Sequence, residues 1–205
     1  MDIIPEFYPE SDDSYLLMDS LKLDNNFLLS RLSVGPVTVE VGPGGGSVSK
    51  YFMDLVEREA TSVFHLAVDV NRYAGVETRS QFVGSACVDV ILADMFSGMR
   101  PEVLVDVIFC NPPYVPSSPI NGARDIRASY AGGERGREFI DAFLPRVADR
   151  LSDKGVFYFL LEKRNDIEEV VCMARDRFGL EATLILDRKI RGEHLFVYRF
   201  IRCSS

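Results

Sequence analysis

From Val37 onward, short apolar runs alternate with helix-length amphipathic segments. Runs rich in Val, Ile, Leu and Phe favour strands, and apolar residues at helical spacing favour helices. Strands that alternate with helices form a mostly parallel sheet with helices on both faces, so the sequence predicts an α/β fold. The expected strands are residues 37–41, 62–69, 88–94, 105–110, 155–161, 180–186 and 194–201. The expected helices are residues 47–59, 133–150 and 166–178.

The last two expected strands depart from this alternation. Their connection, residues 187–193, is short and charged, contains Gly192, and has no room for a helix. Strands joined so briefly pair as an antiparallel hairpin. We therefore expect seven strands in a mostly parallel sheet with an antiparallel C-terminal hairpin strand.

The length of the chain limits its domain organisation. A chain of 205 residues can bury one sizeable core but is short for two ordinary domains, so residues 1–205 are expected to form one domain. Residues 1–36 precede the first strand, and an apolar pattern over residues 15–21 predicts a helix there. Asp13 or Ser14 is the expected N-cap of this helix.

Composition narrows the possible partners and locations. The formal net charge of −8 repels phosphate backbones, which disfavours a dedicated nucleic-acid binder and favours a basic protein or ribonucleoprotein target. No stretch approaches the roughly 20 apolar residues that cross a bilayer. Asp2 and Glu6 stand where a signal peptide carries basic residues, so no leader is expected.

The cysteines do not form a metal-binding pattern. Cysteine occurs at four widely spaced positions with no C-x-x-C pair, and the chain has two histidines, so no zinc-ligand spacing is present. We expect no metal site and reduced, mostly buried thiols of a cytosolic protein. The residues concerned are Cys87, Cys110, Cys172, Cys203, His65 and His194.

A glycine-rich segment, residues 40–46 (EVGPGGG), joins the first strand to the first helix of the sheet. Glycines at this position allow the backbone to approach a ligand closely. Similar turns also bind dinucleotides or serve only as tight connections. The segment therefore indicates a nucleotide-like cofactor only together with other features.

Two acidic residues supply those features. Asp69 ends the second strand 23 residues after Gly46, where a carboxylate can accept hydrogen bonds from both ribose hydroxyls. Asp94 ends the third strand and is followed by Met95 and Phe96, which suits an adenine that is hydrogen-bonded at its amino group and packed on its face. Alone, Asp69 is equally consistent with a helix cap and Asp94 with a solvated strand end.

The fourth strand runs directly into Asn111-Pro112-Pro113-Tyr114. Two prolines fix two φ angles and remove two N–H donors, which leaves a rigid turn with free carbonyls. The Asn111 side chain and the Pro112 carbonyl can then accept from one planar NH2 group while the Tyr114 ring stacks on it. The alternative is a strand end at which Asn111 caps the turn.

These segments together resemble the HemK-type protein glutamine methyltransferases, in particular the short eukaryotic and archaeal branch that modifies the Gly-Gly-Gln glutamine of the class I release factor. Its N-terminal pattern is altered here, with acids at Asp12 and Asp13 and a proline at Pro9. The resemblance implies a Rossmann-like class I methyltransferase fold. The segments that carry it are residues 8–21, 40–46, 68–71, 111–116, 131–139 and 191–200.

The resemblance also implies a site. The methyl donor is S-adenosyl-L-methionine, which becomes S-adenosyl-L-homocysteine. The residues implied to bind the cofactor are Glu40, Gly42, Gly44, Asp69, Val70, Asp94, Met95 and Asn111. Asn111, Pro113 and Tyr114 are implied to bind the substrate glutamine, and Asn111, Pro112 and Tyr114 to take part in catalysis.

Partners follow from the same resemblance. It implies a small zinc-binding activator subunit, and the third strand, expected at the edge of the sheet, offers apolar residues to it. These are Val88, Val90, Ile91, Leu92, Met95 and Phe96. The class I release factor, with its GTPase partner, is the implied substrate, and the implied location is the cytoplasm, with the nucleus as a second one.

Three alternatives remain open from the residues alone. The turn Asn111-Pro112-Pro113-Tyr114, called the NPPY turn below, also suits the amine of a nucleic-acid base. The net charge of −8 argues against a nucleic-acid substrate. An acidic protein also attracts basic tails, which makes lysine methylation an alternative. The last is a cofactor-binding scaffold without catalysis.

Overall fold

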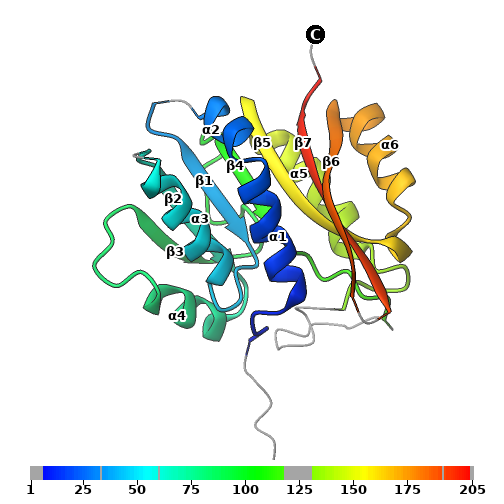
Figure 1. Ribbon diagram of the computed structural model, residues 1–205, viewed down its shortest axis with the longest axis horizontal. Helices are drawn as coiled ribbons and strands as arrows, with labels where there is room; N and C mark the ends of the chain where they lie inside the picture. Colours follow the sequence, from blue (N-terminus) through cyan, green and yellow to red (C-terminus); the bar gives the residue numbers. More distant parts are fainter. Residues whose placement is uncertain (1–6, 33, 60, 118–130, 191, 204–205) are drawn as a thin grey trace, which may run out of the picture.

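The computed structural model describes residues 7–32, 34–59, 61–117, 131–190 and 192–203 (Figure 1). Within these residues, seven strands form one sheet in the order β3-β2-β1-β4-β5-β7-β6. The strands are β1 (Val37–Val41), β2 (Phe64–Asp69), β3 (Val88–Leu92), β4 (Val105–Cys110), β5 (Leu151–Glu162), β6 (Leu180–Ile190) and β7 (Glu193–Arg202). The helices are α1 (Asp12–Leu23), α2 (Asn25–Arg31), α3 (Ser47–Arg58), α4 (Arg72–Ser80), α5 (Glu138–Arg150) and α6 (Ile167–Phe178).

The direction of the strands confirms the predicted architecture. Strands β1 to β5 pair in parallel, whereas β7 pairs antiparallel with both β5 and β6. The last two strands therefore form the expected hairpin, with β7 inserted beside β5. Strand β3 lies at one edge of the sheet, as expected.

Both faces of the central strands are buried. In β4, Val107 and Phe109 pack with α1, α2 and α3, while Ile108 and Cys110 pack with α5 and α6. Helices α1 and α3 lie on one face of the sheet and α5 on the other (Figure 1). Because successive side chains of a strand point to opposite faces, a strand covered on both sides has a continuous apolar sequence. None of the helices described here has the length and apolarity needed to cross a bilayer.

Several element boundaries differ from the prediction. Helix α5 begins at Glu138 instead of residue 133, because Gly133 and Gly136 adopt φ angles of +79° and +67°. Strand β3 ends two residues early, and β5 and β6 are longer than expected. Helices α2 and α4 were not predicted. Helix α4 is short, but Asn71 caps it by accepting a 3.0 Å hydrogen bond from the Tyr73 N–H, a local signal that was available in the sequence.

Two smaller predictions were wrong. The N-cap of α1 is Ser11, not Asp13 or Ser14; Asp13 lies in the first turn, where it is buried. Among the thiols, only Cys110 is buried, and the other three described cysteines are exposed. Cys110 alone belongs to a central strand, whereas the other three lie outside the sheet, in the connection before β3, on α6 and after β7.

Candidate active site

A cavity of about 270 Å³ lies at the carboxyl ends of β1, β2 and β4, where parallel sheets bind ligands. Phe7, Tyr8, Glu10 and Ser14 from the N-terminal segment form part of its wall. All eight residues expected to bind the cofactor line this cavity, and so do the two prolines of the NPPY turn. They are Glu40, Gly42, Gly44, Asp69, Val70, Asp94, Met95, Asn111, Pro112 and Pro113.

The glycine-rich turn fits closely under the N-terminal segment. Gly44 has a φ angle of +56°, and a Cβ atom there would lie 3.0 Å from the Tyr8 carbonyl oxygen. The Gly42 N–H donates to the Val68 carbonyl at 2.8 Å, which holds the turn against β2. The turn therefore needs glycine both for its backbone conformation and for space.

Asp69 is fixed by backbone donors. Its carboxylate accepts hydrogen bonds from the N–H groups of Asn71 at 2.8 Å and Gly44 at 3.3 Å. Burial nevertheless raises the pKa of Asp69 above its ordinary value. Asp94 is exposed, and the following Met95 is buried with a φ angle of +50°. The cavity therefore has one oriented, half-buried carboxylate and one solvated carboxylate.

Glu40 is connected to a buried hydrogen-bond chain. The Ser49 hydroxyl is hydrogen-bonded to the Glu40 carboxyl group and lies 2.8 Å from His65 Nε2. His65 Nδ1 is hydrogen-bonded to the Thr38 hydroxyl at 2.9 Å. Burial raises the pKa of Glu40 to about 8 and lowers the pKa of His65 to about 3. Both groups are therefore neutral near pH 7.

These two pKa values predict opposite dependences of stability on pH. The neutral Glu40 carboxyl contributes its full stabilisation below pH 4.5, the ordinary pKa of glutamate. This stabilisation is lost as pH rises through about 8. The neutral His65 ring contributes its stabilisation above pH 6.5, the ordinary pKa of histidine. This stabilisation is lost as pH falls through about 3. Of these two groups, only Glu40 should lower the free energy of unfolding between pH 6.5 and 8, by up to ~1.4 kcal/mol per pH unit.

Urea unfolding of the wild type and of Glu40→Gln between pH 6.5 and 9 measures this effect. The variant should lack the loss between pH 6.5 and 8, because its amide does not ionise. Exposed Glu57 on α3 supplies the matched control, Glu57→Gln, which should retain it. A wild-type stability with the same slope as that of Glu40→Gln would mean that Glu40 is already ionised in the folded protein.

Asn111 is held in one orientation. Its Nδ2 donates to Asp13 Oδ2 at 2.9 Å, across 98 residues of sequence. Its Oδ1 is buried and has no hydrogen-bond partner within the described part of the chain. A buried acceptor without a partner is costly, and Asn111 lines the cavity. The arrangement suits a ligand that donates an N–H to Oδ1.

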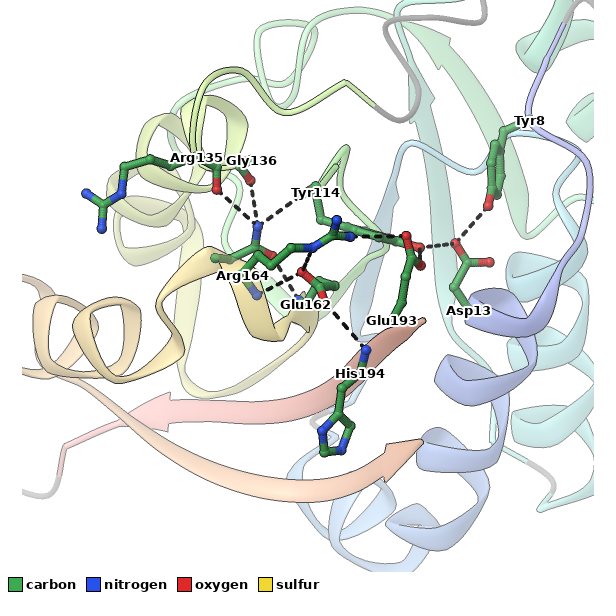
Figure 2. A network of polar contacts seen from close by, with 10 residues as sticks. Tyr8, Asp13, Tyr114, Arg135, Gly136, Glu162, Arg164, Glu193 and His194 are labelled. Atoms are coloured by element: carbon green, nitrogen blue, oxygen red, sulfur yellow. Dashed lines mark hydrogen bonds and ion pairs between the residues drawn. The ribbon is translucent and has the colours of Figure 1, made fainter. Parts of the chain in front are cut away.

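Tyr114 does not line the cavity. The ring is buried, with 8% of the residue exposed, and the hydroxyl lies 3.2 Å from Glu193 Oε2 and 3.4 Å from Asp13 Oδ2 (Figure 2). Burial and the neighbouring carboxylates raise the pKa of Tyr114 above its ordinary value. Stacking of this ring on a substrate stays a prediction; in this structure the hydroxyl connects the NPPY turn to α1 and β7.

The 131–139 segment packs against the backbone of the NPPY turn. A Cβ atom on Gly132 would lie 2.5 Å from the Pro113 carbonyl oxygen, and one on Gly136 would lie 2.1 Å from that of Tyr114. Asn165, which is fully buried, donates to the Tyr114 carbonyl at 2.9 Å and to the Gly136 carbonyl at 3.1 Å. Close packing of two backbones explains why this segment is glycine-rich.

Comparisons with known proteins are consistent with this geometry. Methyltransferase HEMK2 of Homo sapiens is 31% identical over 201 residues, which cover 96% of this chain and 90% of that protein. The Mus musculus protein of the same name is 32% identical over 199 residues, covering 95% and 89%. The chain belongs to the HemK-type methyltransferases. This confirms the resemblance; no protein-family model matches the sequence.

Other relatives of this HemK-type methyltransferase extend the comparison. The eRF1 methyltransferase catalytic subunit mtq2 of Schizosaccharomyces pombe is 26% identical over 218 residues, covering 98% of this chain and 91% of that protein. The solved E. cuniculi Mtq2-Trm112 complex, responsible for methylation of eRF1, contains a chain that matches with a TM-score of 0.67 and 25% identity, covering 96% and 98%. A ribosomal protein L11 methylase with a TM-score of 0.62 and 11% identity, covering 97% and 82%, shares the fold alone.

Proposed function

We propose that this methyltransferase transfers a methyl group from S-adenosylmethionine to the side-chain amide nitrogen of the glutamine in the Gly-Gly-Gln motif of the class I release factor. The observation that carries the proposal is the buried Asn111 Oδ1, an acceptor without a partner beside the cavity among the described residues. A primary amide offers two N–H donors in one plane, which suits this acceptor together with the Pro112 carbonyl.

The residues of the cavity fit S-adenosylmethionine. Gly42 and Gly44 let the backbone approach the ligand, and Asp69 is oriented to accept hydrogen bonds from ribose hydroxyls. Met95 and Phe139 give apolar surface for an adenine ring, beside the Asp94 carboxylate. When bound there, S-adenosylmethionine supplies an electrophilic methyl group on a sulfonium centre.

The protein's contribution to the reaction is mainly orientation. An amide nitrogen is a poor nucleophile because its lone pair is delocalised. Hydrogen bonds from the amide N–H groups to Asn111 Oδ1 and the Pro112 carbonyl raise electron density on nitrogen and hold it in place. No strong base is needed before transfer, and the proton leaves to water afterwards.

We propose a heterodimer with a small zinc-binding activator subunit that pairs with β3. Strand β3 is at the sheet edge, and Leu92 on it is 63% exposed. Val88, Met95 and Phe96 were also expected to face a partner, but they are buried in this protein's own core. Val70 on the connection after β2, and Tyr73 and Val76 on α4, are also exposed. An open apolar edge of this kind favours strand addition. The solved Mtq2-Trm112 complex, in which a similar chain is bound to a second protein, supports a heterodimer.

The mtq2 relative supports the choice of substrate, because it is the catalytic subunit of an eRF1 methyltransferase. We propose that the release factor is modified while bound to its GTPase partner, in the cytoplasm and also in the nucleus. The net charge of −8 supports a protein acceptor without direct contact to nucleic acid.

Mass mapping of the methylated residue tests the proposal. The chain, co-expressed with its activator, is incubated with the release factor and S-adenosylmethionine, and the products are digested and sequenced. We expect one methyl group on the glutamine of Gly-Gly-Gln and none when that glutamine is replaced by alanine. Methyl groups on lysine, or on bases when RNA replaces the release factor in the same assay, would establish one of the other acceptors. Cofactor binding without transfer would establish the scaffold.

A further inference from the structure

Asp13 is an unusually constrained carboxylate. It lies in the first turn of α1, and 3% of the residue is exposed. Its Oδ1 accepts hydrogen bonds from the Ser14 N–H at 2.7 Å and the Ser11 hydroxyl at 2.5 Å. Ser11 is also the N-cap of α1, so the start of this helix fixes the position and rotation of the carboxylate.

The second oxygen of Asp13 faces the NPPY turn. Oδ2 accepts from Asn111 Nδ2 at 2.9 Å. It also accepts from the Tyr8 hydroxyl at 3.0 Å, and the Tyr114 hydroxyl lies 3.4 Å away (Figure 2). Each of these three groups is a donor. The Asn111 carboxamide must therefore turn its NH2 group towards Asp13, which leaves its oxygen as the buried atom without a partner among the described residues.

We infer that Asp13 is a positioning residue that selects the productive orientation of the Asn111 carboxamide; the inference rests on the proposed function. The oxygen and nitrogen of a carboxamide have almost the same shape, so packing alone does not distinguish the two orientations. The reversed orientation would present an NH2 group to the substrate NH2 group. Asp13 prevents this, because its oxygens only accept.

The same hydrogen bond strengthens Asn111 as an acceptor. A carboxylate that accepts from one end of an amide polarises it, which increases the negative charge on the amide oxygen. Positive charge that develops on the substrate nitrogen during transfer is then better stabilised. Asp13 thus acts through Asn111 and is not assigned any contact with the substrate.

The test uses Asp13→Asn in the heterodimer with the activator. The asparagine keeps the shape of the side chain but offers an NH2 group to Asn111, which allows the carboxamide to turn. We expect kcat to fall by about 30- to 100-fold, with KM and the Kd of S-adenosylmethionine changed by less than about threefold. The matched control is Asp12→Asn, one residue away and exposed, which should leave all three values unchanged.

A reciprocal exchange separates positioning from a structural role. In the double variant Asp13→Asn with Asn111→Asp, the new asparagine donates to the new aspartate, whose second oxygen again serves as an acceptor. We expect its kcat to exceed that of either single variant by about tenfold or more. A double variant no better than the singles, or an Asp13→Asn variant with more than half the wild-type kcat, would overturn the inference.

A measurement without turnover distinguishes this inference from the proposed function. The side-chain NH2 resonances of Asn111, assigned by comparison with Asn111→Ala, should shift or broaden in Asp13→Asn but not in Asp12→Asn. If the wild-type heterodimer methylates no glutamine while these resonances behave as expected, the proposed function fails and the orientation by Asp13 stands. Unchanged resonances in Asp13→Asn would refute the orientation itself.

Discussion

Replacement of Asn111 by alanine is expected to reduce kcat for methyl transfer by about 10²- to 10³-fold, while the Kd of S-adenosylmethionine changes by less than about threefold. The variant removes the buried oxygen that we propose accepts a hydrogen bond from the substrate amide. The glycine-rich turn and Asp69 are left intact, and Asp13 keeps donors from Ser11, Ser14 and Tyr8. Single-turnover rates with the release factor and calorimetric titration with the cofactor measure the two quantities separately.

Asn25 provides a control of the same chemistry. Its Oδ1 is likewise buried without a partner among the described residues, but it lies on α2 and does not line the cavity. Asn25→Ala should leave kcat unchanged. If Asn111→Ala abolished cofactor binding, or if both variants lost activity equally, Asn111 would not be the acceptor of the substrate amide.

Gly136→Ala is expected to lower the free energy of unfolding by about 3 kcal/mol or more, a large part of the stability of a typical domain. The added Cβ atom would lie 2.1 Å from the Tyr114 carbonyl oxygen and 2.6 Å from Asn165 Nδ2. These two atoms are hydrogen-bonded to each other, so neither can move without breaking that bond. The NPPY turn should therefore shift, and methyl transfer should fall together with stability.

Gly35→Ala separates this clash from backbone strain. Gly35 has the same φ angle of +67°, but a Cβ atom there would meet nothing within 4 Å. Its replacement should cost only about 1 kcal/mol, the ordinary penalty for a left-handed alanine. Equal losses for the two variants in urea unfolding would show that the contact with Tyr114 contributes nothing.

The sheet could be predicted from the sequence because each strand and its connection are marked by residues that are adjacent in the chain. Strands buried on both faces give continuous apolar runs, as in residues 107–110, and the short 187–193 connection implied the hairpin. Helix α4 gave only a weak signal, because it has nine residues with Gly75 among them. The start of α5 was placed too early because the glycines that precede it were read as part of the helix.

The cavity was also predictable, since its residues follow successive strands and parallel strands end at one edge. The groups that orient the NPPY turn were not. Asp13 and Glu193 lie in two segments that carry the family resemblance, residues 8–21 and 191–200, but no local pattern shows that they contact the NPPY turn. Asn165 lies in the 3-10 turn after β5, and no motif marks it. Their roles depend on contacts between residues far apart in the chain, which a local pattern does not encode.

The neutral Glu40 has a consequence for the thermodynamics of ligand binding. A cation that enters the cavity favours the ionised carboxylate and so lowers the pKa of Glu40 from about 8. Binding of S-adenosylmethionine near pH 7 should then expel a proton, and the measured enthalpy should vary with the ionisation heat of the buffer. S-adenosylhomocysteine lacks the sulfonium charge and should expel less. The donor would thus be favoured over the product as pH rises towards 8, a selectivity set by one buried acid.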